Sequence, residues 1–348
     1  MGGPLSPEDE GGRRLSAQLL SARDLRVEFG LPGGRVARAV DGVDLDVAPG
    51  EIVALAGESG CGKTTLARTL LGLERATGGE VSFGGVPLSH KSKALKAYRR
   101  RVQLILQDPT GALNPRHTVY DAVAEGLRIH GITGNETERV SEALARAGLR
   151  PPERFFLSYP HELSGGQRQR VVIAGALVLH PHIIVADEPV ASLDASVRGE
   201  ILALLLRLKE EMDLGALVIT HDLGLAWSIA DRIAIMYLGR IVEQGTVEQV
   251  LTDPRHPYTQ ALVSVLPGSL QKAQSPVREP IVLTGELPDA ANIPGGCRFR
   301  PRCQEFSSGR AAAVAARCQH EDLEVMGAQT VDHAVACHLH RLQVKEAA

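Results

Sequence analysis

The chain of 348 residues lacks features that mark several classes of protein. Its formal net charge is -3, so it has no overall excess of basic residues of the kind that nucleic-acid-binding proteins carry. Residues 1–18 contain no apolar stretch flanked by positive charge, so the sequence predicts no signal peptide there and instead a disordered tail. We therefore expect no nucleic-acid partner, and we expect the chain to stay in the cytosol.

Long apolar runs and a disulfide pattern are also missing. The longest apolar stretch, Val171 to Ala186, is interrupted by His180, Pro181 and His182, whereas a membrane span needs roughly 18 apolar residues in a row. If the protein works at a membrane, other subunits must span it. Four of the five cysteines crowd into the C-terminal segment, which is not the pattern of a secreted disulfide scaffold.

A glycine-rich segment, GESGCGKTT, matches the pattern G-x-x-x-x-G-K-[ST]. Residues 52–56 before it are typical of a short buried strand, and residues 66–73 after it of the first turns of a helix. Because loop N–H groups and a helix N-terminus converge on one anion in this setting, the segment predicts a phosphate-binding loop. The loop consists of Gly57, Glu58, Ser59, Gly60, Cys61, Gly62, Lys63, Thr64 and Thr65.

Residue types within this phosphate-binding loop fit the chemistry of a nucleotide. The glycines let the backbone approach the phosphates, Lys63 is predicted to reach the β and γ oxygens, and the Thr64 hydroxyl to ligate Mg²⁺. We interpret Cys61 as a small residue tolerated at a phosphate site and not as a metal ligand. A chance glycine-rich turn is the alternative, and the strand, loop and helix order argues against it.

The segments around the loop predict a mixed α/β arrangement. Residues 19–50 alternate as antiparallel strands do, and Phe29 among them is either an aromatic that stacks on adenine or an ordinary core residue. Residues 80–88 predict a hairpin, and residues 102–107 a buried strand that ends at Gln107. The segment from Val119 to Leu149 has a helical pattern without strand signals, so we predict a helical insertion there.

Strand ends later in the chain carry polar side chains. Residues 182–189, HIIVADEP, predict an apolar strand that ends in Asp187 and Glu188, where Asp187 would reach Mg²⁺ and Glu188 would orient the attacking water. Helix capping is the alternative role for these acids. GALVITHD predicts another buried strand with His221 at its end, either a γ-phosphate contact or a hydrogen-bonded surface residue.

A second glycine-rich element, LSGGQ, precedes a helix predicted to start near Gln167. Its N-terminus suits an anion, although Ser followed by Gly also caps helices that bind nothing. Together with the phosphate loop, Gln107, VADEP, the SLD run at 192–194 and His221, this element resembles the nucleotide-binding subunit of an ATP-binding-cassette (ABC) transporter. LSGGQ is the most specific of these motifs.

The resemblance covers residues 19–253, with a helical subdomain at about 116–165. It implies an α/β fold, in which a P-loop ATPase core carries an antiparallel β subdomain and a helical insertion. Residues 254–348 would form a small cysteine-containing C-terminal extension. Two such subunits would pair head to tail, and the signature of one would cap the ATP bound by the other. The signature residues are Leu163, Ser164, Gly165, Gly166 and Gln167.

The same resemblance implies a role for each site residue. Phe29 becomes the adenine platform, Glu188 the general base, His221 the residue that holds the transition state, and Asp194 the link between the two sites of the dimer. Gln107 would sense the γ-phosphate. The Mg²⁺ ligands would be Thr64, Gln107 and Asp187.

A narrower resemblance lies after the core. HPYTQAL at 256–262, followed by the cysteine-bearing tail, resembles the ATPase subunits of bacterial dipeptide, oligopeptide and nickel importers. It implies two transmembrane permeases, an extracytoplasmic substrate-binding protein and a peripheral position at the cytoplasmic face of the plasma membrane. Peptide import is the expected function, and import of nickel or another small solute is the alternative. A soluble ABC ATPase of DNA repair or translation is disfavoured, because no coiled coil or zinc knuckle separates loop and signature.

Four soft thiolates in a cytosolic tail favour a metal centre over disulfides. Zinc sites usually show C-x₂₋₄-C spacing, which the wider first gap fits poorly, and some members of the importer group bind a [4Fe-4S] cluster. We therefore predict [4Fe-4S], with Zn²⁺ and free thiols as alternatives. Neighbouring Arg298, Arg300 and Arg302 would offset thiolate charge, bind a permease, or form a solvated basic patch. The cysteines are Cys297, Cys303, Cys318 and Cys337.

Overall fold

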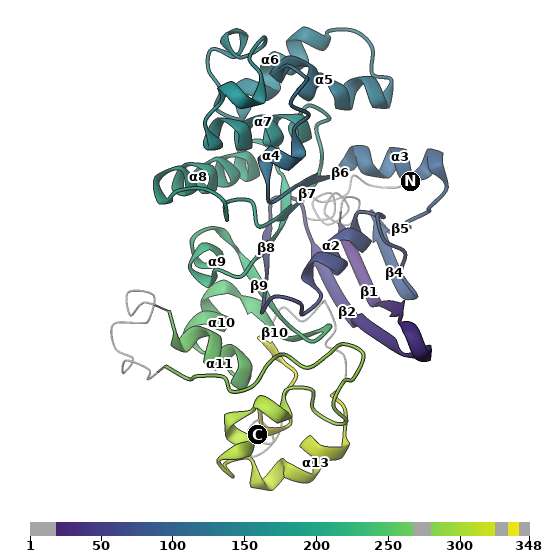
Figure 1. Ribbon diagram of the computed structural model, residues 1–348, viewed down its shortest axis with the longest axis vertical. Helices are drawn as coiled ribbons and strands as arrows, with labels where there is room; N and C mark the ends of the chain where they lie inside the picture. The colour runs from purple at the N-terminus through teal and green to yellow at the C-terminus, as the bar shows by residue number, and fades with distance from the viewer. Residues whose placement is uncertain (1–18, 267–279, 324–332, 341–348) are drawn as a thin grey trace, which may run out of the picture. The chain divides into compact units, whose positions relative to one another are not determined.

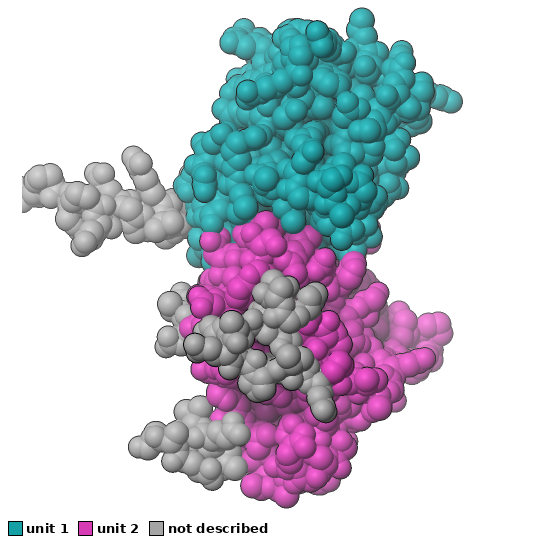
Figure 2. Space-filling view, turned by 90° about the vertical axis from the view of Figure 1, so that its left-hand side faces the viewer, with its two compact units in different colours: residues 1–20, 47–52, 82–219 teal, residues 21–46, 53–81, 220–348 magenta. Residues whose placement is uncertain are grey.

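The structure, a computed structural model, describes residues 19–266, 280–323 and 333–340. The tail predicted for residues 1–18 lies outside the described residues. The chain divides into two compact units, each built from separate stretches of sequence (Figure 2). The first unit comprises 1–20, 47–52 and 82–219, and the second 21–46, 53–81 and 220–348.

In the first unit, parallel strands run in the order β8-β7-β6. These are β6 (Val102–Ile105), β7 (Ile183–Asp187) and β8 (Gly215–Thr220). Strands β7 and β8 are buried along almost their whole length, which explains why they read as unbroken apolar runs. The strands predicted within 102–107, 182–189 and 215–222 are thus confirmed, although β6 ends at Ile105 and not at Gln107. The unit also holds β5 (Val86–Pro87), which pairs with the end of β4 (Gly78–Phe83) to form the predicted hairpin.

The predicted helical insertion is confirmed as α5 (Val119–His130) and α6 (Glu136–Arg146), which pack against each other and against α7 (Gly165–Leu177) (Figure 1). Helix α7 begins two residues before the predicted start at Gln167. The reason is the cap: Ser164 accepts a hydrogen bond from the N–H of Gln167, and the Gln167 side chain accepts one from the N–H of Ser164. The other helices here are α3 (Ser92–Arg101), α4 (Pro109–Ala112) and α8 (Ala195–Met212).

The second unit contains strands in the order β11-β10-β9-β3, with β3 parallel to β9 and the others antiparallel. A second sheet in this unit places β1 between β2 and β4. The strands are β1 (Leu20–Gly30), β2 (Val36–Val47), β3 (Ile52–Ala56), β4 (Gly78–Phe83), β9 (Arg232–Tyr237), β10 (Arg240–Thr246) and β11 (Ala334–Val335). The helices are α2 (Lys63–Leu70), α9 (Leu223–Ile229), α10 (Val247–Thr252), α11 (Pro257–Ser264), α12 (Gln304–Ser307) and α13 (Ala315–His320).

The described part of the C-terminal extension has a small core of its own. Ala311, Val314 and Cys318 are buried there, and Cys297, Phe306 and Leu339 pack against them. Strand β11 adds the extension to the edge of β10, and buried Glu243 of β10 accepts a hydrogen bond from the N–H of His256 at 2.9 Å. The extension is therefore continuous with the second unit.

His256 predicts a pH dependence of stability. Burial lowers the pKa of this side chain to about 4, against the partial opposition of Glu243, whereas a histidine in an unfolded chain titrates near pH 6.5. Between these values the unfolded chain takes up a proton that the folded chain does not, so stability falls as the pH falls. Between about pH 7.5 and about pH 5, we expect the free energy of unfolding of wild type to fall by about 2 kcal/mol more than that of His256→Asn.

Urea titrations of both proteins at the two pH values measure this difference. His256 accepts a hydrogen bond from the N–H of Tyr258 at 3.0 Å, and asparagine at this helix cap keeps an acceptor there. Equal pH slopes for the two proteins would show that His256 does not titrate as its burial implies.

Candidate nucleotide site

The phosphate-binding loop joins β3 to α2 in the second unit. Two of its glycines have backbone angles and surroundings that exclude a side chain. Gly57 has φ 153°, and a Cβ there would lie 2.2 Å from the carbonyl oxygen of Met236; Gly62 has φ 112°, and a Cβ there would lie 2.1 Å from that of Ala39. Helix α2 begins at Lys63, before the predicted start at residue 66, because left-handed Gly62 forms its N-cap.

The ammonium group of Lys63 binds the backbone of the loop itself. Its Nζ donates hydrogen bonds to the carbonyl oxygens of Gly57 at 2.7 Å and Glu58 at 2.8 Å, and the side chain is almost fully buried. Burial raises the pKa of the Cys61 thiol, although the charge of Lys63 partly opposes this. Our interpretation of Cys61 as a small residue tolerated in the loop stays a prediction.

His221 follows β8 and lies near the loop. It lines a pocket of about 380 Å³ together with Gly57 and Glu58 of the loop, Leu223 of α9 and Leu262 of α11. The structure thus brings the predicted γ-phosphate contact and the phosphate-binding loop to one pocket of the second unit.

In the first unit the structure brings Gln107 and Glu188 together. The side-chain amide of Gln107 donates a hydrogen bond to the Glu188 carboxylate at 3.1 Å, although 81 residues separate them. Asp187 is the last residue of β7, and Glu188 has φ 47°, in the left-handed region that is strained for this residue type. Its N–H donates to the carbonyl oxygen of Ile219 at 3.0 Å, which fixes this turn.

Ser164 and Asp194 both cap helices within this chain. Ser164 accepts a hydrogen bond from the N–H of Gln167 at 3.2 Å, and Asp194 accepts bonds from the N–H groups of Ser196 and Val197 at the start of α8. The hydrogen bond from the Ser196 hydroxyl, together with these backbone bonds, lowers the pKa of Asp194. Capping is therefore one role of each side chain, and their roles toward a second subunit stay predictions.

Phe29 is 39% exposed on β1, so its ring is not the ordinary core residue that the sequence left open. Thr64 lies in the first turn of α2, directly after Lys63. Neither the stacking of Phe29 on adenine nor the Mg²⁺ contact of Thr64 is tested by these positions, and both stay predictions.

The expected metal centre is not supported. Among the described residues, which include all four cysteines of the extension, no group of three or more Cys, His, Asp or Glu side chains is arranged to hold a metal ion. Cys297 and Cys318 do lie side by side, since the N–H of Cys297 donates to the carbonyl oxygen of Cys318 at 2.9 Å. Burial raises the pKa of Cys297 to about 12 and that of Cys303 to about 11, so both are neutral thiols at pH 7.

Two of the three arginines beside these cysteines, Arg298 and Arg302, are buried and paired and so do not belong to a solvated patch. The Arg298 guanidinium binds the carboxylate of Asp41 and the carbonyl oxygen of Leu238, and its side chain is 7% exposed. Arg302 pairs with Glu58 of the phosphate-binding loop at 2.9 Å, also with a 7% exposed side chain. The sequence gave no direct signal for either pair, because the partners lie more than 200 residues apart.

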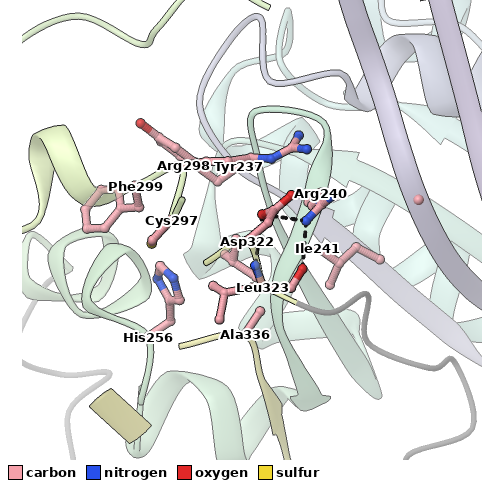
Figure 3. A pocket seen from close by; sticks show the side chains of 12 residues that line it. Tyr237, Arg240, Ile241, His256, Cys297, Arg298, Phe299, Asp322, Leu323 and Ala336 are labelled. Atoms are coloured by element: carbon pink, nitrogen blue, oxygen red, sulfur yellow. Dashed lines mark hydrogen bonds and ion pairs between the residues drawn. The ribbon is translucent and has the colours of Figure 1, made fainter. Parts of the chain in front are cut away.

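Tyr258 is a second contact of the loop that the sequence did not predict. Its hydroxyl accepts a hydrogen bond from the N–H of Glu58 at 2.9 Å. The HPYTQAL segment was the available signal, but the sequence alone does not say what Tyr258 touches. Phe299 and His256 lie beside Tyr258 and face a cavity of about 20 Å³ that Cys297 also lines (Figure 3).

Comparison with known proteins places these features in a family. The family model for "ABC transporter" matches residues 40–191, and that for "Oligopeptide/dipeptide transporter, C-terminal region" matches residues 242–309. The chain is 41% identical to the oligopeptide transport ATP-binding protein AppF of Bacillus subtilis, over 92% of this chain and 97% of that protein. It is 42% identical to the dipeptide transport ATP-binding protein DppF of Escherichia coli, over 83% of this chain and 88% of that one.

Solved structures agree with these relatives. CbiO1 of Clostridium perfringens, described as part of an ABC transporter complex, matches with a TM-score of 0.60 at 30% identity, over 67% of this chain and 90% of that one. A dimeric post-hydrolysis ATP-binding cassette, MJ0796 bound to ADP and phosphate, matches with a TM-score of 0.58 at 30% identity, over 66% of this chain and 98% of that one. In the described ranges, no helix is long and apolar enough to cross a membrane. The chain therefore belongs to the ABC transporter family of ATPases, in the group whose members carry the oligopeptide/dipeptide transporter C-terminal region.

Proposed function

We propose that this ATPase drives the import of peptides. The observation that carries the proposal is the match of residues 242–309 to the family model of the oligopeptide/dipeptide transporter C-terminal region, which follows the ATPase motifs. Relatives named for oligopeptide and dipeptide transport agree with it. The partners would be two transmembrane permeases and an extracytoplasmic binding protein. The chain would then lie at the cytoplasmic face of the plasma membrane as a peripheral subunit.

Uptake by cells that lack only this chain tests the substrate class. We expect such cells to lose accumulation of labelled di- or oligopeptides and to recover it when the chain is returned. If these cells lose nickel accumulation but take up peptides normally, the substrate is nickel and not a peptide. Normal uptake of both would contradict the importer proposal.

We propose the following ATP chemistry for the residues described above. The loop from Gly57 to Thr65 binds the phosphates, with Lys63 on the β and γ oxygens, and Phe29 stacks on adenine. Glu188 acts as general base toward the attacking water, and its hydrogen bond to Gln107 supports a shared task for the two. His221 contacts the γ-phosphate, as its place beside Gly57 in one pocket supports. Mg²⁺ would be held by Thr64, Gln107 and Asp187.

We also propose that the signature at 163–167 acts on the ATP of a second subunit, which is either another copy of this chain or a related one. Gly165 and Gly166 open α7 directly after the Ser164 cap, so N–H groups of the first helical turn lack partners within the helix. The dimeric state of the similar cassette MJ0796 supports this pairing. Size measurement of Glu188→Gln with MgATP, alone and mixed with a candidate partner chain, distinguishes the two kinds of dimer.

The helical part of the first unit is the proposed docking surface for a permease. Leu157 is 82% exposed and Ile129 58% exposed there, large apolar side chains that a partner would cover. Cysteines introduced at these two positions are expected to cross-link to a permease in the assembled transporter. Val282, 80% exposed in the C-terminal extension, offers the matched control position. Cross-links that formed mainly at position 282 would contradict this docking surface.

We also propose a metal centre at the four cysteines of the C-terminal extension, on the basis of the donor chemistry of thiols. Cys318 packs with Cys297 in the core of the extension, and beyond the effect of burial, Cys303, Cys318 and Cys337 all lie close enough to raise the pKa of Cys297. Since ligand geometry is absent among the described residues, the side chains would have to move and lose protons to bind a metal. When bound, a [4Fe-4S] cluster or Zn²⁺ would hold the extension together as a structural staple.

Anaerobic purification tests this proposal. We expect about four irons per chain and a brown protein for [4Fe-4S], or one zinc and no colour for the alternative. Cys297→Ser is expected to lose the metal, whereas Cys61→Ser, which lies outside the extension, keeps the same metal content. Anaerobic protein without either metal, together with rapid alkylation of all four thiols, would contradict the proposal.

A further inference from the structure

Glu58, in the phosphate-binding loop, is held from three directions. Its N–H donates to the Tyr258 hydroxyl at 2.9 Å, its carbonyl oxygen accepts from Lys63 Nζ at 2.8 Å, and its carboxylate accepts from Arg302 at 2.9 Å. Tyr258 and Arg302 belong to the C-terminal extension, while Lys63 belongs to the loop itself. The extension therefore touches the same loop residue as the phosphate-binding lysine.

Both extension residues are fixed by packing. Tyr258 is fully buried, and its ring lies edge-on to Tyr237 with centroids 4.8 Å apart and 5.5 Å from the ring of Phe299. The guanidinium of Arg302 lies 6.0 Å from the centre of the Tyr237 ring. An ion pair whose arginine is this well buried and stacked is worth more than an exposed pair, because solvent screens it less.

The charge of Glu58 gives these contacts a consequence for ATP. A carboxylate in a loop that binds phosphates repels them, and Coulomb energies between charges a few ångström apart are substantial near a protein surface. Arg302 neutralises this carboxylate through its ion pair at 2.9 Å, and the Glu58 side chain is 27% exposed. The Tyr258 hydroxyl fixes the backbone of the same residue and thereby the course of the loop.

We propose that Arg302 and Tyr258 are positioning residues for ATP binding, and that the C-terminal extension through them sets the affinity of the loop for ATP. By binding Glu58, these two residues keep the shape and the charge of the loop suited to phosphates. This inference rests on the phosphate-binding role proposed for Lys63. It concerns contacts within the second unit only.

The dissociation constant of MgATP for the full-length chain, measured by titration calorimetry, tests the proposal. Arg302→Ala leaves a carboxylate unpaired in the loop, and we expect binding about tenfold weaker. Tyr258→Phe keeps the ring and removes only the hydroxyl, with binding about fivefold weaker. Adding Glu58→Gln to Arg302→Ala removes the unpaired charge, so most of the affinity should return.

Arg310→Ala provides the matched control. Arg310 forms an ion pair with Glu305 at 2.7 Å within the same extension, and neither residue is a partner of the loop in this structure. We expect wild-type affinity for this variant. If Arg302→Ala and Tyr258→Phe also bind ATP like wild type, or if Glu58→Gln restores nothing, the positioning role is wrong.

Lys63→Ala separates this failure from failure of the ATP site. If Lys63→Ala loses affinity while Arg302→Ala and Tyr258→Phe keep it, the site stands and the positioning role falls. If Lys63→Ala also binds like wild type, the phosphate-binding role of the loop falls first. If Arg302→Ala lowers the melting temperature but leaves the affinity for ATP unchanged, Arg302 only stabilises the fold and the inference is overturned.

Discussion

Glu188→Gln is expected to lower kcat for ATP hydrolysis by about 100-fold or more and to leave ATP binding in place. A carboxamide still forms hydrogen bonds with water, but it cannot accept a proton from it. The hydrogen bond from Gln107 at 3.1 Å requires only an oxygen acceptor, which glutamine retains. Steady-state hydrolysis by the assembled transporter and MgATP titration of the variant measure the two quantities separately.

Glu211→Gln is the control for this substitution. Glu211 is an exposed carboxylate in α8 that lies 3.7 Å from Arg207, so its loss should change neither quantity. If Glu188→Gln hydrolyses ATP as fast as wild type, Glu188 is not the general base. A loss of ATP binding as large as the loss of turnover would point instead to a collapsed turn at its left-handed backbone position.

Lys63→Ala is expected to weaken ATP binding by roughly 10- to 100-fold, since hydrogen bonds to a charged group contribute about 1.5–3 kcal/mol. The lost ammonium group contacts the phosphates of bound ATP before any reaction, so affinity falls in addition to turnover. Titration of the full-length chain with MgATP measures the effect.

Substitution of Lys63 also removes the hydrogen bonds to the carbonyl oxygens of Gly57 and Glu58, so the loop itself loses support. Lys63→Arg keeps the charge and should fall between wild type and alanine. Lys93→Ala, at an exposed lysine of α3, serves as the control with unchanged affinity. Equal affinity of wild type and Lys63→Ala would contradict the phosphate-binding role of the loop.

Local patterns predicted the strands up to β8 and the helices α2 and α5 to α7, because the physics that forms them acts over a few residues. The short apolar run of β3 lies before a glycine-rich loop, and the helices α5 and α6 show apolar residues at helical spacing. Helix starts were less accurate: α2 and α7 both begin earlier than their apolar patterns suggest. Gly62 and Ser164 set those starts through backbone conformation and capping, which leave little trace in hydrophobic periodicity.

The residues of the nucleotide site could also be predicted in part from the sequence. Glycines at 57 and 62 are required by a close approach of backbone atoms, and a motif records that requirement in the sequence. The Arg298, Arg300 and Arg302 run was harder to interpret. Charge alone fitted a solvated patch, and only burial against Asp41 and Glu58 shows that two of these arginines are paired.

The sequence by itself determined where the strands up to β8 and the helices α2 and α5 to α7 form, since these elements depend on neighbouring residues. It also predicted which loop binds phosphates. Only the tertiary structure decided what the C-terminal extension touches. Contacts such as Glu58 with Tyr258 and Arg302 join residues 200 and 244 positions apart. The strength of such contacts comes from burial and from exclusion of water, and both exist only after distant segments have packed together.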